Sequence, residues 1–174
     1  MNLYSFHSKP EQLLHADTAH DAVPHLFWRK YKNNPAELKK RESALAADPV
    51  YAGWYAKNVL KGPFVAGEAA IAKHGEVAYQ YADEILKRPF PAGEAAIAKY
   101  PNYAYLYAVD ILKGPFPAGE AAMAKKVEWA YQYAKNVLKG PFAAGEAIIA
   151  ADPEYAQKYA KHVLKGPFPA GNIK

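Results

Sequence analysis

The side chains best suited to chemistry gather near the start of the chain, where histidines alternate with aspartates: His7, His15, Asp17, His20, Asp21 and His25. Imidazole and carboxylate groups bind zinc and other divalent metals. His15 and His20 are five residues apart, as are His20 and His25, whereas two ligands on one face of a zinc-binding helix are four apart. We therefore expect capping and surface roles and no cofactor. The alternative is a metal-dependent enzyme that uses His15, Asp17, His20 and His25.

A second candidate is a lysine that recurs at a fixed interval, as Lys61, Lys87, Lys113, Lys139 and Lys165. If the segments that carry these lysines stack side by side, about 10 Å apart, the lysines form a basic ridge. Such a ridge could follow a phosphate backbone, so nucleic-acid or nucleotide binding is one alternative function. The competing interpretation is structural, because a lysine at the end of a helix is favourable by itself.

Aromatic and apolar side chains supply a third candidate, a face that binds a protein. Tyr79, Tyr105 and Tyr131 are expected at the flank of a buried stripe, partly exposed. Trp54, Leu106 and Val109 fall where the chain is otherwise polar, and exposed apolar groups on a wet face indicate a contact surface. The competing interpretation is that the N-terminal region covers Trp54, or that isolated exposed apolar residues have no role.

The lysines of the second candidate and the aromatic and apolar residues of the third belong to a repeat of 26 residues that begins at Asp48. Four complete units (48–73, 74–99, 100–125 and 126–151) are followed by a shorter fifth unit, 152–174, without any insertion or deletion. In each unit the apolar residues stand at positions 4, 5, 8, 9, 12 and 13, which is a helical stripe and not a strand pattern. A fixed period in this range is typical of a helical solenoid.

Each unit therefore predicts a first helix near positions 2–14 and a second near 18–26. We expect two groups of stripe residues to be buried: Tyr55, Tyr81, Tyr107 and Tyr133 at position 8, and Leu60, Leu86, Leu112 and Leu138 at position 13. A phenylalanine at position 17 should fill the gap between the two helices. Asp48 and Asp152 precede prolines and predict N-caps.

The end of the first helix is marked by Lys-Gly, and we expect glycine to take the left-handed conformation there. The second unit has Arg88 in place of this glycine, so its cap should be different or strained. The glutamate at position 21 should lie in the first turn of the second helix, where it could also pair with the lysine.

Residues 1–47 precede the regular units and predict an irregular helical cap. Asn33-Asn34-Pro35 should begin a helix over about 36–46, and its tail from Glu42 matches the second helix of the first unit in register. The predicted architecture is thus an all-α solenoid of five antiparallel helix pairs, in one domain that joins a diverged N-terminal repeat to residues 48–174.

Three stretches of the third unit show a resemblance to known proteins. Tyr103-Ala104-Tyr105-Leu106-Tyr107-Ala108, followed by Ile111-Leu112-Lys113-Gly114 and Phe116-Pro117-x-Gly119-Glu120, resembles short tandem helical repeats of tailed bacteriophages and large DNA viruses. The resemblance covers roughly 41–174. The viral repeats carry Arg between Gly and Phe, whereas every unit here has Pro. The resemblance implies a viral origin and a role directed at a host protein, with no assigned activity.

The composition of the chain excludes only a few classes of function. The chain lacks cysteine, which excludes disulfides and thiolate metal sites, and its net charge of +5 is spread along its length. No apolar run approaches membrane-spanning length and the first residues do not form a signal peptide, so we expect a cytoplasmic protein. The sequence favours a non-enzymatic interaction module with a protein partner and no membrane contact. At the C-terminal end, either Phe168 and Ile173 fold back over the apolar face of the last unit or two chains meet there in a homodimer.

Overall fold

A computed structural model describes residue 29 and residues 33–169, and every regular element within them is a helix. The first helices of the five units are α3 (Pro49–Tyr55), α5 (Gly75–Gln80), α7 (Pro101–Leu106), α9 (Val127–Gln132) and α11 (Pro153–Tyr159). The second helices of the four complete units are α4 (Glu68–Ile71), preceded by the 3₁₀ turn η4 (Val65–Gly67), then α6 (Pro91–Ile97), α8 (Pro117–Met123) and α10 (Ala143–Ala150). The all-α repeat solenoid is confirmed.

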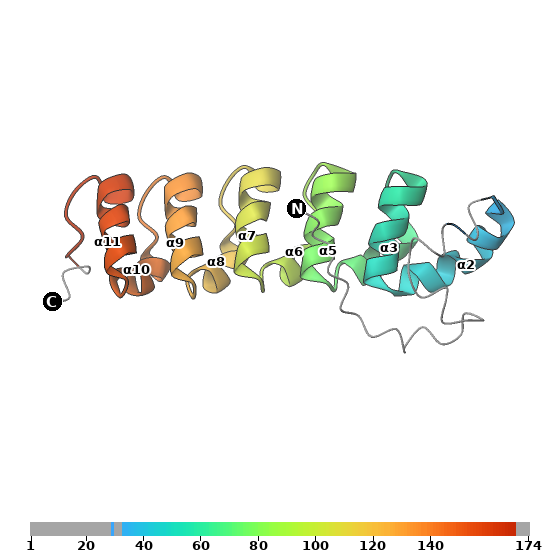
Figure 1. Cartoon of the computed structure of the whole chain (residues 1–174), viewed down its shortest axis with the longest axis horizontal. Helices are drawn as coiled ribbons and strands as arrows, with labels where there is room; N and C mark the ends of the chain where they lie inside the picture. The colour runs from blue at the N-terminus through green and yellow to red at the C-terminus, as the bar shows by residue number, and fades with distance from the viewer. Residues whose placement is uncertain (1–28, 30–32, 170–174) are drawn as a thin grey trace.

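The units stack in a single row. Figure 1 shows the first helices side by side along the long axis, with the short second helices along one edge of the row. Helix α2 (Pro35–Ala47) lies next to the first unit. Asn34 Oδ1 accepts a hydrogen bond from Glu37 N at 3.2 Å and caps α2. As predicted, Asp48 caps α3 and Asp152 caps α11. The carboxylate of each aspartate accepts hydrogen bonds from two backbone N–H groups of the helix.

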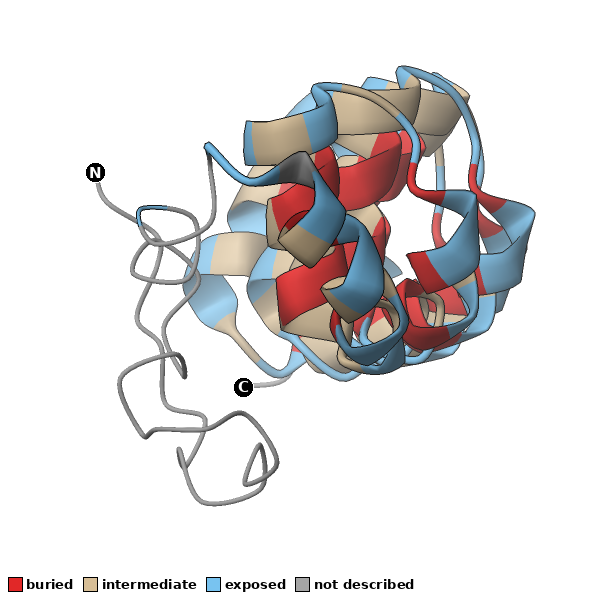
Figure 2. Ribbon diagram, turned by 90° about the vertical axis from the view of Figure 1, so that its right-hand side faces the viewer, coloured by how far each residue is buried: buried red, intermediate tan, exposed pale blue. Residues whose placement is uncertain are grey.

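The core is one continuous cluster of buried residues from Leu38 to Phe168. Figure 2, which looks down the row, shows the buried segments between the two layers of helices. The position-8 tyrosines are buried as predicted, and the alanines at positions 5 and 9 are buried beside them, except Ala160, which is half-buried. The second helices contribute one fully buried side chain each at position 24: Ile71, Ile97, Met123 and Ile149. Each layer therefore covers an apolar stripe that the other could not bury alone.

The phenylalanines at position 17 fill the gap between the two helices of a unit, as predicted. Phe90 is buried, and its ring lies edge-on to that of Tyr81 with 5.3 Å between centroids. A Cβ atom on Gly93 would come within 2.6 Å of the Phe90 ring and 2.8 Å of Ala78 Cβ. Only glycine fits there, which explains the glycine at position 20 of every complete unit.

The prediction that the position-13 leucines are buried is wrong. Leu60 is 42% exposed, and Leu86, Leu112 and Leu138 are half-buried. The cause is a change of helix type, since each first helix continues into a π-helical segment: η3 (Ala56–Leu60), η5 (Tyr81–Leu86), η6 (Tyr107–Leu112), η7 (Tyr133–Leu138) and η8 (Ala160–Leu164). A π-turn holds more residues than an α-turn, which rotates position 13 away from the stripe.

The left-handed residue at the helix end is lysine and not glycine, contrary to the prediction. Lys61, Lys87, Lys113, Lys139 and Lys165 have φ between 52° and 54°, and no described glycine has a positive φ. The π-helix ends at position 13, so position 14 makes the turn. The next residue only donates its N–H to the position-9 carbonyl, as Gly62 does to Ala56 O at 3.1 Å.

In the second unit the expected strain at Arg88 is absent, but its cap differs as expected: the N–H groups of Lys87 and Arg88 make no hydrogen bond to Ala82 O, whereas the equivalent bonds are present in the other four units. Lys87 makes the turn with φ 53°, like the other lysines. A Cβ on Gly62, the residue equivalent to Arg88, would meet no atom closer than 3.8 Å. A side chain is accommodated at this position without rearrangement.

Replacing Ile97 by Ala should lower the free energy of unfolding by about 2–5 kcal/mol, because it leaves a cavity in the sealed core. Replacing Leu112 by Ala should cost clearly less, about 1 kcal/mol, since Leu112 is half-buried. Equilibrium urea unfolding of both variants checks this difference. Equal losses would mean that the π-segment turns Leu112 inward in solution.

Candidate interaction surface

The units are joined by a three-residue hydrogen-bond relay centred on the position-8 tyrosine. Phe90 N donates to the Tyr107 hydroxyl at 2.8 Å, and that hydroxyl donates to Glu94 Oε1 at 2.9 Å. Phe90 and Glu94 belong to the second unit, whereas Tyr107 belongs to the third. One hydroxyl thus satisfies a loop N–H and a carboxylate of the preceding unit, and it uses both its donor and its acceptor capacity.

The relay repeats at every junction between regular units, with Tyr81, Tyr133 and Tyr159 in the place of Tyr107. At the junction with α2, the Tyr55 hydroxyl donates to Glu42 Oε1 at 3.0 Å. Glu42 precedes Tyr55 by the same 13 residues that separate Glu94 from Tyr107. Helix α2 thus presents its glutamate to the next unit in the register predicted from the sequence.

Burial and the adjacent carboxylate keep the relay hydroxyls protonated. Burial is the larger cause, and together with the hydrogen bond to Glu94 it raises the pKa of Tyr107 to about 12. The same causes raise the pKa of Tyr81, Tyr133 and Tyr159 to about 12. The position-21 glutamates accept hydrogen bonds from tyrosine, so their structural partner is a neighbouring unit and not the lysine that the sequence suggested.

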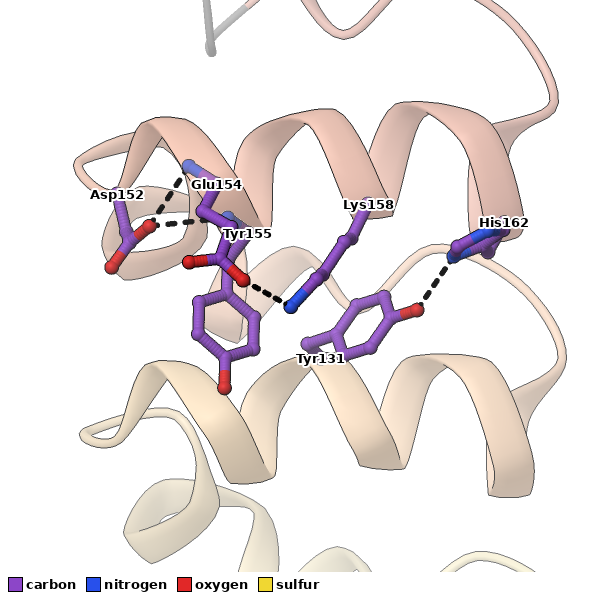
Figure 3. Close-up of polar contacts among 6 residues, drawn as sticks. All are labelled: Tyr131, Asp152, Glu154, Tyr155, Lys158 and His162. Carbon is purple, nitrogen blue, oxygen red and sulfur yellow. Dashed lines mark hydrogen bonds and ion pairs between the residues drawn. The ribbon is translucent and has the colours of Figure 1, made fainter.

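The position-6 tyrosines form a second row of contacts between units. The Tyr79 hydroxyl donates to Asp110 Oδ2 at 3.0 Å, and Asn136 Nδ2 donates to the Tyr105 hydroxyl at 2.7 Å. The Tyr131 hydroxyl lies 2.8 Å from His162 Nδ1 (Figure 3). Each bond joins position 6 of one unit to position 11 of the next.

The rings of these tyrosines also lie against aromatic side chains at position 4 of the next unit, namely Tyr103, Trp129 and Tyr155. The expectation of a partly exposed flank is wrong for Tyr131, which is only 4% exposed. Tyr79 and Tyr105 are half-buried. Their rings and hydroxyls are engaged between units, so Tyr79, Tyr105 and Tyr131 do not form a free binding platform.

The fifth unit changes the residue at position 6 from tyrosine to Gln157. Gln157 and Lys161 are exposed, whereas Tyr159, Val163 and Phe168 are buried. Polar side chains therefore stand on the side of α11 where units two to four carry their inter-unit tyrosines. Dimerisation through this end stays a prediction, and Ile173 lies outside the described residues.

The candidate apolar face divides into a packed part and an exposed part. Trp54 is half-buried and packs against the core. Leu106 is half-buried at position 7 of the third unit, and Val109, at position 10, is 36% exposed. The equivalent residues of the fourth unit are Gln132 and Lys135. Leu106 and Val109 thus interrupt the polar outer surface of the first helices.

The predicted lysine ridge forms the rim of this outer surface. All five position-14 lysines are exposed, and each stands directly after the last residue of a π-segment. The π-segments end on the same side of the row, opposite the second helices (Figure 1). We use the name lysine row for Lys61, Lys87, Lys113, Lys139 and Lys165.

The conformation of the lysine row is costly. A left-handed residue with a Cβ costs roughly 1–2 kcal/mol relative to the right-handed region, and glycine avoids this penalty. A cation at a helix C-terminus recovers about 0.3–1 kcal/mol. Glycine follows the lysine in four of the five units, yet the strained position keeps lysine in all five. Folding alone does not explain this choice, so the charge itself is a candidate functional feature.

The metal alternative falls outside the described residues, because His15, Asp17, His20 and His25 all precede residue 29. Among the residues that the structure describes, no group of three or more His, Asp or Glu side chains could hold a metal ion. In the same part of the chain, no helix is long and apolar enough to cross a membrane.

Comparison with known proteins adds no homologue: the chain matches no protein-family model, no curated protein and no solved structure.

Replacing Tyr107 by Phe should destabilise the array by about 1–3 kcal/mol, because the buried Phe90 N–H loses its acceptor and Glu94 loses its donor. Chemical unfolding measures the loss. Tyr100→Phe is the matched control, since Tyr100 is exposed. If the two variants were equally stable, the relay would not hold the units together.

Replacing Lys113 by Gly should leave the stability nearly unchanged, because the relief of left-handed strain offsets both the entropy cost of glycine, about 0.5–1 kcal/mol, and the lost charge at the helix end, about 0.3–1 kcal/mol. Lys125→Gly is the control, since this exposed lysine has no positive φ and its replacement should be destabilising. Thermal unfolding of both variants provides the comparison. A loss of stability in Lys113→Gly as large as that in Lys125→Gly would contradict the assigned strain.

Proposed function

We propose that the chain is a non-enzymatic helical-repeat scaffold that binds a protein partner on the outer surface of its first helices. The observation that carries the proposal is the pair Leu106 and Val109, two apolar side chains left outside the core at positions that are polar in the neighbouring units. Apolar groups on an otherwise polar face are typical of protein contact surfaces.

Different positions of the repeat serve stacking and surface display, which supports a scaffold function. The tyrosine hydroxyls and glutamates of the units are engaged in holding neighbours together. What varies from unit to unit is the outer surface at positions 3, 7 and 10, where the third unit carries Asn102, Leu106 and Val109. A constant stacking layer with a variable outer face suits recognition of an extended partner.

The resemblance to viral repeats directs the search for that partner to host proteins. Under this proposal the chain acts in the host cytoplasm, where it captures or inhibits a host factor. The lysine row supports a second candidate function, nucleic-acid binding, because its charges recur at the regular spacing of stacked helices.

The test is capture of proteins from a bacterial lysate by the immobilised chain and by a double variant, Leu106→Lys with Val109→Lys. Lysine removes the apolar contact and preserves the basic character of the face. We expect at least about tenfold less captured partner, since apolar anchors commonly contribute 1–2 kcal/mol each.

Val65→Lys is the matched control. Val65 is 76% exposed but lies at the start of the second-helix layer of the first unit, away from the outer face. Capture that survives in the double variant, or that is lost equally in the control, would remove Leu106 and Val109 from the site.

A further inference from the structure

The outer surface is not uniformly charged, and its charge changes along the row. In units two and three, Asp83, Glu84 and Asp110 stand at positions 10 and 11 beside the lysine row. Glu84 forms an ion pair with Lys57, and Asp110 accepts the Tyr79 hydrogen bond. The middle of the row is therefore close to neutral.

Units four and five have no acidic residue at positions 10, 11 or 14. Lys135 and Lys139 stand there in the fourth unit, and Lys161 and Lys165 in the fifth. Lys135, Lys139, Lys161 and Lys165 are all exposed. We call these four residues the basic patch. It adjoins Leu106 and Val109, which stand one unit before it.

Units four and five carry four acidic side chains, of which Glu128 and Asp152 stand at the start of the first helices, at the end away from the patch. Glu154 pairs with Lys158 at the other end of α11 (Figure 3), and Glu146 accepts the Tyr159 hydroxyl. Each is engaged with a neighbour of its own. The patch thus keeps an uncompensated positive charge.

Resting on the proposed function, we propose that the partner presents an extended acidic polypeptide segment to the basic patch, with apolar side chains that contact Leu106 and Val109. Stacked helices lie 8–10 Å apart. A polyproline II chain advances about 3.1 Å per residue with three residues per turn, so every third side chain lies on the same face and meets the next unit. Carboxylates at this spacing face successive lysines.

A nucleic acid fits the same surface less well. A continuous phosphate backbone that followed the whole lysine row would meet Asp83, Glu84 and Asp110 in the middle of it. The rings of the position-6 tyrosines pack against aromatic side chains of the next unit, so they offer no free ring to a base. A polypeptide, by contrast, can carry acidic side chains opposite the basic patch and apolar side chains opposite Leu106 and Val109.

The experiment measures fluorescence anisotropy of the full chain with a labelled peptide that has glutamate at every third position followed by a pair of leucines. Lys139→Gly with Lys165→Gly should weaken binding about tenfold, and glycine suits the backbone conformation at both positions. Lys61→Gly with Lys87→Gly makes the same backbone change outside the patch and should leave affinity within about twofold.

Three further measurements decide between the occupants. A peptide with glutamine for glutamate should bind weakly, and affinity for the glutamate peptide should fall between about 50 and 200 mM salt. No binding of the glutamate peptide at the lower salt, or equal losses in the two double variants, would overturn the inference. Tighter binding of short duplex DNA than of the peptide would also overturn it and assign the row to nucleic acid.

The outcome separates this inference from the proposed function. If binding depends on the leucines of the peptide and on Leu106 and Val109 but not on glutamate, only the acidic partner is refuted. If binding depends on glutamate but not on Leu106 and Val109, the apolar contact of the proposed function is refuted instead.

Discussion

The structure depends on one buried hydroxyl per unit. A tyrosine side chain reaches back to the preceding unit, accepts a hydrogen bond from a loop N–H and donates one to a glutamate, as Tyr107 does with Phe90 and Glu94. A buried backbone donor and a carboxylate without partners would each be costly. Because each unit satisfies the polar groups of its neighbour, a helix pair is complete only within a stack. The relay therefore fixes both the spacing and the register of the array.

The sequence was sufficient to predict the architecture, since a strict period of 26 residues and a helical stripe leave few alternatives. It also predicted the caps at Asp48 and Asp152 and the burial of the tyrosines and phenylalanines. The sequence did not predict the conformation at the end of the first helix. Apolar residues four apart suit both an α-helix and a wider π-turn, so the change of helix type at Tyr107 is not visible in the pattern, and the burial of Leu112 was overestimated for this reason.

The candidate site was harder to predict because its residues are defined by their partners. A tyrosine such as Tyr131 can be an exposed binding residue or a buried contact, and the sequence does not distinguish the two. Only the structure shows that Tyr131 contacts Tyr155 and His162 of the next unit. Leu106 and Val109 could be found because the repeat supplies its own reference, with polar residues at the same positions in other units. The left-handed conformation of the lysine row could not be predicted from the sequence, because the adjacent glycine is the residue that usually adopts it.

Amide hydrogen exchange at the loop phenylalanines tests the central claim most directly. Phe90 N is bonded to a tyrosine hydroxyl of the next unit and not to its own helix, so its exchange should require separation of the two units and should be as slow as exchange in the core. In the Tyr107→Phe variant, Phe90 should lose its protection while Phe142, which is bonded to Tyr159, keeps it. Rapid exchange of Phe90 in the unmodified protein would contradict the account, because the units would then be held together by apolar packing without the relay.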